Sequence, residues 1–473
     1  MGWSSSVREC GPASLRNLAA AGLIGAAAIL PQAAAAQLSD QEAARHSLNL
    51  VVAEPRRGIN SLSALVDEGD PALAHSIITA MRFSWLPPAT LQAALEILAD
   101  GTYPADDPPQ GWFDWVLWRE QTTDVSAHAS FPDFQRRLLA TIDPRFLDFL
   151  PEGVDHEIRL EEIAWGGVGV DSIPALTNPD LIDAAEADYL AGDDLVFGVE
   201  INGDARAYPL RILNWHEMFN DVIGGVPVSL AYCTLCGAGI LFDTTVEGYD
   251  EPFVFGSSGF LYRSNKLMYD TATRSLWNQF TGRPVVGPLT GSGIELPIRP
   301  VAITSWDNWL ERHPDTRVLS LDTGYPRDYS PGAAYGEYFA SPELMFPALL
   351  RDDALAQKDY VFGIRAPGGA KAWPLEAFEG GAVINDRVGF VDVVLIGDAE
   401  TRTVRAYRRD ETEFAVESNS LNRLTGDGTG WTVTEDALVA DDGRTLPREP
   451  GHVAYWFAWA GYLRDAELYE VPE

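Results

Sequence analysis

The chain has 473 residues, with 69 Asp and Glu against 34 Lys and Arg, and its formal net charge is −35. A field of that sign repels phosphate backbones, so we expect no binding of nucleic acid. The chain is longer than a typical domain of about 100–200 residues, and we therefore expect two or three packed units.

The first segment has the pattern of a cleavable signal peptide. Arg8 and Arg16 lead into the apolar run LAAAGLIGAAAIL, which ends in PQAAAAQ, and the expected cut lies after Ala36. An uncleaved anchor is the alternative, but a membrane span needs roughly 20 apolar residues and this run is shorter. We therefore assign residues 1–36 to the signal peptide. The sequence predicts a periplasmic or extracellular protein with no stable membrane insertion after cleavage.

Residues 37–150 are predicted to form a helical region. The stretches SLSALVDEGDPALAHSIITAMRF and PATLQAALEILADG carry apolar residues at helical spacing, and Gly101 closes the second one. Two further segments, WFDWVLWRE and FPDFQRRLLATIDPRFLDFL, complete this region.

From about residue 151 the pattern changes to short β-branched and aromatic runs separated by Gly, Asn and Pro. LVFGVEI-NG-DARAYP predicts a hairpin, because Asn202-Gly203 can supply the positive φ angles of a tight turn. LMYD-TATR-SLWNQF is a second candidate hairpin. The whole pattern predicts an α+β protein with a helical N-terminal region followed by a β-rich domain.

An internal repeat divides this β-rich domain into two related units, 151–330 and 331–473. VFGVEINGDARAYPLRIL matches VFGIRAPGGAKAWPLEAF at an offset of 165, and LPIRPVAITSWDNW resembles LPREPGHVAYWFAW at an offset of 150. The ordered set makes coincidence improbable, so we expect a duplicated fold whose second copy is shortened between these blocks.

Chemistry is expected in the first copy alone, around Cys233, Cys236 and His216. The positions opposite these three residues in the second copy hold Asp398, Thr401 and Gly381. His216 falls in a short helical segment, and the strand VPVSLAY then delivers the chain to the Cys-x-x-Cys turn.

Three readings of the Cys-x-x-Cys pair remain open. Two thiolates and an imidazole suit a borderline-to-soft metal ion, and copper is favoured over iron or zinc outside the cytoplasm. Met268 is a candidate soft axial ligand. A redox disulfide is the second reading, although the following GAGILFD predicts turn and strand, not the helix that lowers a thiol pKa. A structural disulfide is the third, and its loop is too short to add much stability.

Two carboxylates are candidate catalytic groups. Glu217 follows His216 directly and could act as a general base, and Asp270 lies on the second hairpin, where it could line the pocket with Trp277 and Gln279. A solvated helix carboxylate is the alternative reading for Glu217. No Gly-x-Ser-x-Gly elbow occurs around Ser257-Ser258-Gly259, so serine hydrolysis has little support.

The stretches AYPLRILNWHEMFNDVIGGVPVSLAYCTLCGAGILFD and FGSSGFLYRSNKLMYDTATRSLWNQFTGRPVVGPLTG resemble the domain-of-unknown-function family 3179. The likeness runs from about 155 to 330, with a weaker trail to the C-terminus. The family pattern usually has Pro after the first cysteine, where this chain has Thr234. The resemblance implies an exported or membrane-associated prokaryotic protein. It supports the His-Glu and Cys-x-x-Cys elements as the residues that matter and implies no activity.

Three functional hypotheses follow. The leading one is an exported metalloprotein with Cys233, Cys236 and His216 as ligands, acting in redox chemistry or metal handling. The second is a thiol–disulfide protein that uses the cysteine pair directly, and the third is a non-enzymatic binding module. The expected partner is an unknown small molecule or redox partner.

Overall fold

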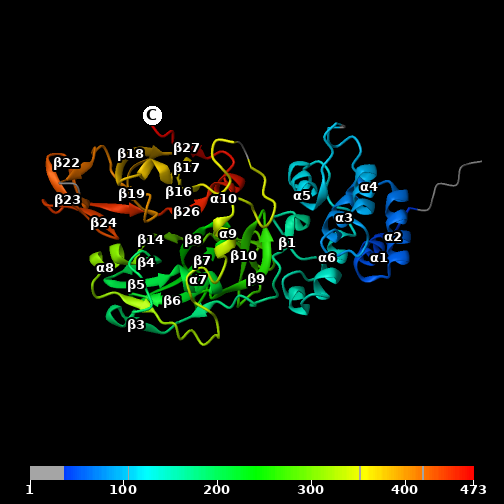
Figure 1. Cartoon of the computed structure of the whole chain (residues 1–473), viewed down its shortest axis with the longest axis horizontal. Coiled ribbons are helices and arrows are strands. Elements are labelled where there is room, and N and C mark those ends of the chain that lie inside the picture. The colour runs from blue at the N-terminus through cyan, green and yellow to red at the C-terminus, as the bar shows by residue number, and fades with distance from the viewer. Residues whose placement is uncertain (1–36, 105, 351–352, 418–419, 473) are drawn as a thin grey trace, which may run out of the picture. The chain divides into compact units, whose positions relative to one another are not determined.

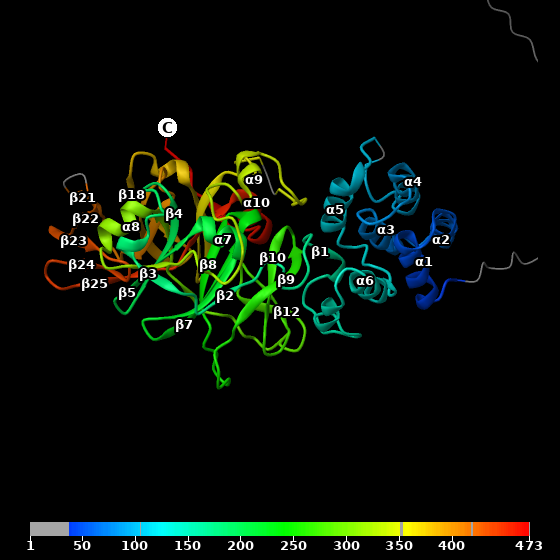
Figure 2. The ribbon, with the colours of Figure 1, turned by 60° about the horizontal axis from the view of Figure 1, so that its bottom comes forward.

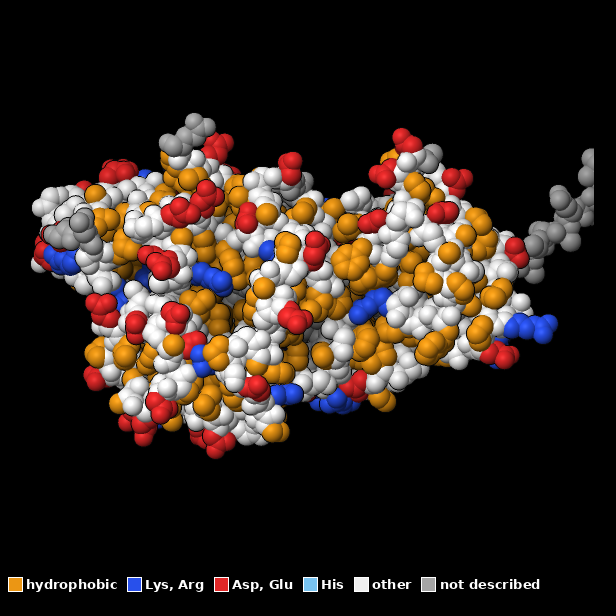
Figure 3. All heavy atoms as spheres, in the orientation of Figure 1, with side chains coloured by type: hydrophobic (Ala, Val, Ile, Leu, Met, Phe, Trp, Pro, Cys, Tyr) orange, Lys and Arg blue, Asp and Glu red, His pale blue; other side chains and the backbone are white. Residues whose placement is uncertain are grey.

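The protein is described by a computed structural model that covers residues 37–104, 106–350, 353–417 and 420–472. The predicted signal peptide lies outside the described residues. Helices occupy residues 40–148 and strands dominate the remainder (Figure 1), which confirms the α+β class. No helix in the described ranges is long and apolar enough to cross a membrane. Acidic side chains are spread over the face in Figure 3, where basic ones are sparse.

The described residues of the helical region form six α-helices. They are α1 (Asp40–Val52), α2 (Pro55–Glu68), α3 (Ala74–Ala80), α4 (Pro88–Leu98), α5 (Gly111–Gln121) and α6 (Phe131–Ala140), with 3-10 turns η1 (Pro71–Leu73) and η2 (Pro144–Asp148). A capping box between Ser39 and Glu42 starts α1. The longest predicted helical stretch is interrupted, because Gly69 adopts a left-handed φ of 72° that ends α2.

The first β-rich unit carries most of the strands that hold the candidate site. Its elements are η3 (Leu160–Glu162), β1 (Ile163–Trp165), β2 (Leu176–Thr177), β3 (Leu181–Asp183), η4 (Ala184–Glu186), β4 (Leu195–Ile201), β5 (Asp204–Pro209), α7 (Leu210–His216), β6 (Met218–Ile223), β7 (Val226–Cys233), η5 (Thr234–Cys236), β8 (Ala238–Asp243), β9 (Phe255–Tyr262), β10 (Asn265–Asp270), β11 (Leu276–Asn278), β12 (Arg283–Val286), β13 (Ile298–Arg299), β14 (Ala302–Ser305), α8 (Trp306–Arg312) and β15 (Arg317–Leu319). Both predicted hairpins are present, as β4–β5 and β10–β11.

The second unit follows a connecting segment that contains α9 (Gly336–Ala340). Its elements are β16 (Tyr360–Ala366), β17 (Gly369–Pro374), η6 (Leu375–Phe378), β18 (Ala382–Val388), β19 (Val391–Asp398), β20 (Thr403–Arg408), β21 (Ala415–Glu417), β22 (Ser420–Gly426), β23 (Thr429–Val433), β24 (Ala437–Ala440), β25 (Thr445–Glu449), β26 (His452–Tyr455), α10 (Trp456–Tyr462) and β27 (Glu467–Leu468).

The two units share one topology, as the repeat predicts. One sheet has the order β14-β4-β5-β15-β3, and its counterpart has β26-β16-β17-β27. The registers agree as well: Val196 pairs with Pro209, and Val361 pairs with Pro374. β15 is parallel to β5 in the first sheet, and β27 is parallel to β17 in the second. The duplication therefore extends to individual strand pairs.

The change of offset has a structural cause. In the first unit, strands β9–β12 are inserted between β8 and β13, and in the second unit β21–β24 occupy the corresponding place between β20 and β25. Arg299 pairs with Leu241, and Glu449 pairs with Ala406, so the copies are again in register after these insertions. Strands β9–β12 therefore give the first copy residues that the second copy does not have.

A tryptophan packed on a glycine recurs in the core of both units. A Cβ built on Gly198 would lie 2.2 Å from the ring of Trp309, and one built on Gly363 would lie 2.2 Å from the ring of Trp459. All four residues lie within the repeated blocks, on a β-strand and on the helix packed against it. Glycine is required here for this close approach of helix and strand.

Candidate functional site

At the end of α7, the side chains of His216 and Glu217 point in different directions. His216 is the last residue of the helix, and Glu217 adopts a left-handed φ of 55° that turns the chain into β6. Successive helical residues are about 100° apart around the axis. The structure therefore brings Glu217, and not His216, to the Cys-x-x-Cys turn.

His216 is fully buried, and both of its ring nitrogens have partners. Nδ1 lies 2.8 Å from the carbonyl oxygen of Pro174 and must donate to it, so in the neutral ring Nε2 accepts from the hydroxyl of Tyr329 at 2.6 Å. Burial, together with the charge of Arg327, lowers the pKa of His216. Both ring nitrogens of His216 are therefore engaged away from the cysteines.

The two cysteines lie at the end of β7 and in the 3-10 turn η5, and both are free thiols. Cys233 is 2% exposed and Cys236 is fully buried. The Cys236 thiol donates to Oδ1 of Asn265 at 3.1 Å and lies 3.3 Å from the carbonyl oxygen of Ser264. Burial, the hydrogen bond with Cys233 and the charge of Glu217 raise the pKa of Cys236 well above its usual range.

A buried ion pair lies beside the cysteine turn. Glu217 Oε2 accepts from Lys266 Nζ at 2.8 Å, and the two side chains are only 10% and 5% exposed. The other carboxylate oxygen accepts from the Thr234 hydroxyl at 2.9 Å and from the Tyr335 hydroxyl at 3.3 Å. Thr234 stands between the two cysteines, so the carboxylate of Glu217 anchors the turn directly.

The strands on each side of the turn are braced by Gln279. Its amide nitrogen donates to the carbonyl oxygens of Ala231 and Ala238, at 2.7 and 2.9 Å. Gln279 therefore links the backbones of β7 and β8, and its predicted place in a pocket wall stays a prediction.

The connecting segment, defined here as residues 323–350, covers the site with tyrosines. Tyr329 bonds His216, Tyr335 bonds Glu217, and the Tyr338 hydroxyl donates to the carbonyl oxygen of Leu235 at 2.6 Å. In both ribbon views α9 lies beside α10 (Figures 1 and 2). A segment distant in sequence therefore closes the turn off from solvent.

The second unit contributes the remaining wall. The rings of Tyr360 and Tyr455 lie 4.5 Å apart, and a Cβ added at Gly237 would approach Tyr360 to 2.9 Å. Gly237 has a φ of 59° and directly follows Cys236. Its lack of a side chain allows the aromatic pair to lie against the cysteine turn.

Met268 and Asp270 lie apart from this cluster. Met268 is fully buried in an apolar core cluster with Trp277. Asp270 is also fully buried, and its carboxylate accepts from Trp277 Nε1 at 2.9 Å and from the backbone and hydroxyl of Thr273. These contacts fix the β10–β11 turn, and the catalytic and ligand roles of the two residues stay predictions.

The equivalent turn of the second unit contains no cysteines. Asp398 Oδ1 accepts from the backbone amide of Thr401 at 3.0 Å, and the Thr401 hydroxyl lies 3.3 Å from the same oxygen. An Asp–Thr hydrogen bond thus holds the turn that two thiols occupy in the first unit.

The predicted metal ligands do not converge. No group of three or more His, Cys, Asp or Glu side chains in the described ranges is arranged to hold a metal ion. His216 is engaged by Pro174 and Tyr329, which leaves the cysteine pair without the third ligand that the sequence suggested. The side chains as placed do not fit a Cys2His centre.

Several residues of the site carried little signal in the sequence. Lys266 is one of only three lysines in a chain rich in arginine, and this rarity could have marked it. Asn265, Tyr335 and Tyr338 had no comparable mark, since nothing in the sequence indicated which distant segments meet the turn.

Of the three comparisons with known proteins, only the one with protein families found a match. Searches among curated proteins and among solved structures found no match. One protein family matches over residues 170–466, which is more than half of the chain and spans both β-rich units. The chain belongs to the family described as "Protein of unknown function (DUF3179)".

Proposed function

We propose that the protein is a thiol–disulfide redox protein in which Cys233 and Cys236 alternate between a dithiol and a disulfide. The observation that carries this proposal is a pair of free thiols in one tight turn, of which Cys236 makes hydrogen bonds to the residues around it. Cys236 donates to Asn265 and Ser264, and its pKa is raised. An exported location, which we also propose, would suit this chemistry because disulfides persist in oxidising compartments.

The two sulfurs have distinct roles in the reaction. A thiolate is the attacking species, and Cys236 is held as a thiol, so we assign the first attack to Cys233. The Cys233 thiolate attacks a disulfide of a protein or small-molecule partner, a mixed disulfide forms, and one partner thiolate leaves. Cys236 then loses its proton and attacks the Cys233 sulfur, which releases the second partner thiolate. The pair loses two electrons, and the partner disulfide gains them.

Access is the main requirement of this reaction. Both cysteines are almost completely buried, and the connecting segment and the Tyr360–Tyr455 pair cover them. The Tyr338 hydrogen bond to the turn must therefore break before a disulfide can reach Cys233. Thiol exchange is expected to be slow in the closed protein and faster when Tyr338 no longer donates.

The test uses a chain carrying Cys10→Ser, so that Cys233 and Cys236 are the only thiols. Reduced protein is titrated with glutathione buffers of increasing potential, free thiols are counted after unfolding, and bound metal is assayed in parallel. We expect both thiols to disappear together with a single midpoint and a mass loss of two hydrogens.

Single substitutions separate the two sulfurs. With oxidised glutathione, Cys236→Ser should accumulate a mixed disulfide on Cys233, whereas Cys233→Ser should accumulate far less. Two thiols that persist throughout the titration, or a stoichiometric metal that protects them, would exclude the redox proposal. The second result would favour the metal-binding hypothesis.

A further inference from the structure

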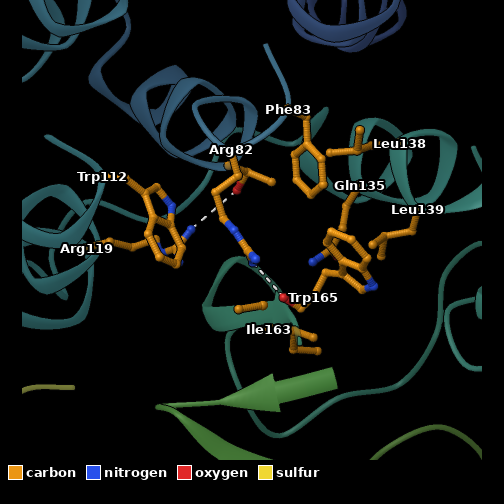
Figure 4. Close-up of a pocket in the computed structure, with 11 residues that line it drawn as sticks. Arg82, Phe83, Trp112, Arg119, Gln135, Leu138, Leu139, Ile163 and Trp165 are labelled. Carbon is orange, nitrogen blue, oxygen red and sulfur yellow. Dashed lines mark hydrogen bonds between the residues drawn. The ribbon is translucent and has the colours of Figure 1, made fainter. Parts of the chain in front are cut away.

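A second polar site lies between the helical region and β1, outside the cysteine cluster. It is a pocket lined by residues from α5, α6, β1 and the end of α3, among them Arg82, Trp112, Arg119 and Trp165 (Figure 4). No Asp or Glu lines it, although the chain as a whole is strongly acidic. Two guanidinium groups thus share one small pocket with no carboxylate in its lining.

Arg119 is a buried cation without an ion-pair partner among the described residues. It is 3% exposed, its Nη1 donates to the hydroxyl of Thr79 at 3.3 Å, and its Nε has no hydrogen-bond partner. Burial lowers the pKa of Arg119 to about 10, so the group remains charged at neutral pH. The nearby carboxylates of Glu120, Glu162 and Glu161 partly offset this burial, although none forms an ion pair with Arg119 among the described residues. A buried donor left without a hydrogen bond, as Nε is here, is costly to the folded state.

Arg82 also lines this pocket, and aromatic rings surround its guanidinium group. Its Nη1 donates to the carbonyl oxygen of Trp165 at 2.5 Å, and its guanidinium lies 4.8 Å from the centre of the Trp112 ring and 5.1 Å from that of Phe346. It forms no ion pair within the described ranges. Stacked guanidinium groups keep their edge donors available, and these suit the two oxygens of a planar anion.

The rest of the lining is mostly apolar, with Thr79 and Gln135 as its other polar side chains. Figure 4 shows Arg119 and Trp112 on one side, Leu138 and Leu139 on the other, and Arg82 between them. The free volume is about 30 Å³, which is enough for a few atoms and too little for a sugar or a nucleotide.

We propose that this pocket binds a short-chain carboxylate of the size of acetate or propionate. The carboxylate group accepts hydrogen bonds from Arg82 and Arg119, and the short alkyl group lies against Leu138 and Leu139. The anion supplies the hydrogen-bond acceptor that Nε of Arg119 lacks among the described residues. This site is independent of the proposed redox reaction at Cys233 and Cys236.

The test measures binding of sodium acetate and sodium propionate to the full-length protein by isothermal titration calorimetry and by thermal shift, against sodium chloride at equal ionic strength. Wild-type protein should show saturable binding and a rise in melting temperature specific to the carboxylates. Arg119→Met and Arg82→Met should weaken binding by about tenfold or more, as expected for the loss of a charged hydrogen bond.

A matched control removes the same charge from the surface. Arg137 lies on α6 and is 43% exposed, and it pairs with Asp133, so Arg137→Met should bind both acids as the wild type does. Equal effects of acetate and chloride on wild type, or equal responses of Arg119→Met and Arg137→Met, would overturn the proposal. Binding of inorganic phosphate in preference to acetate would overturn it as well.

Discussion

Replacing Lys266 by methionine tests the buried ion pair beside the cysteine turn. Lys266 Nζ lies 2.8 Å from Glu217, and both side chains are largely buried. Removing one partner of such a pair typically costs about 3–5 kcal/mol, because a charge is left uncompensated in the interior. Glu217 would keep its hydrogen bonds from Thr234 and Tyr335, so we expect a loss near the lower end, about 3 kcal/mol.

The assay is urea unfolding followed by tryptophan fluorescence, with a double-mutant cycle of Lys266→Met and Glu217→Gln. The double variant should recover part of the loss, because neither charge remains buried, and the interaction energy should be about 2 kcal/mol. Lys371→Met is the control, since Lys371 pairs with Asp386 at 2.8 Å in a more exposed setting of the second unit, and it should cost less.

Two results would refute this reasoning. One is a loss below about 1 kcal/mol for Lys266→Met, which is the range of an exposed pair. The other is a double variant less stable than Lys266→Met alone. Either result would mean that water or other side chains compensate Glu217 and that the pair does not anchor the turn.

Three further predictions concern burial and packing. Burial, with the charge of Arg365, lowers the pKa of His452 to about 3. As the pH falls, the imidazole of His452 is therefore protonated in the unfolded state before it is protonated in the folded state. The contribution of His452 to the free energy of unfolding is therefore fully present above the unfolded pKa of about 6.5 and falls by about 2 kcal/mol by pH 5. In urea titrations at several pH values, His452→Gln should reduce this fall. An unchanged pH dependence in the variant would contradict the prediction. Gly198→Ala and Gly363→Ala should each destabilise the protein by about 1–3 kcal/mol, because the added methyl group clashes with a tryptophan. Gly336→Ala is the control, since no atom lies within 4 Å of the added Cβ, and it should not destabilise the protein. Equal melting temperatures for all three variants would be inconsistent with this packing. Tyr338→Phe should speed alkylation of the native thiols, and rates equal to wild type would argue against a closing role.

Much of the β-rich fold could be predicted because its signals are local and occur twice. Asn202-Gly203 adopts φ angles of 53° and 82°, as the predicted hairpin requires. The repeat correctly indicated two copies of one unit, since the blocks shared by both copies, such as the tryptophan over a glycine, serve the packing of the fold. The break at Gly69 was missed because apolar residues on both sides continue the same helical spacing.

The site was harder to predict because its parts are distant in sequence. The Cys-x-x-Cys turn and the neighbouring His-Glu pair were identified, but sequence spacing does not tell which side of a short helix faces the turn. The left-handed conformation of Glu217 decides this, and it directs Glu217 towards Thr234. Tyr335 and Tyr338 lie about a hundred positions away from the turn, and no local pattern predicts such contacts.

The second unit has a structural role at a site whose candidate chemistry lies in the first unit. Its turn at Asp398 and Thr401 has no thiols, yet its residues Tyr360 and Tyr455 pack against the cysteine turn of the first unit. The unit without cysteines thus encloses part of the cysteine turn of the other unit. The halves are thus no longer interchangeable, and a fragment ending near residue 330 would leave its sulfurs open to water.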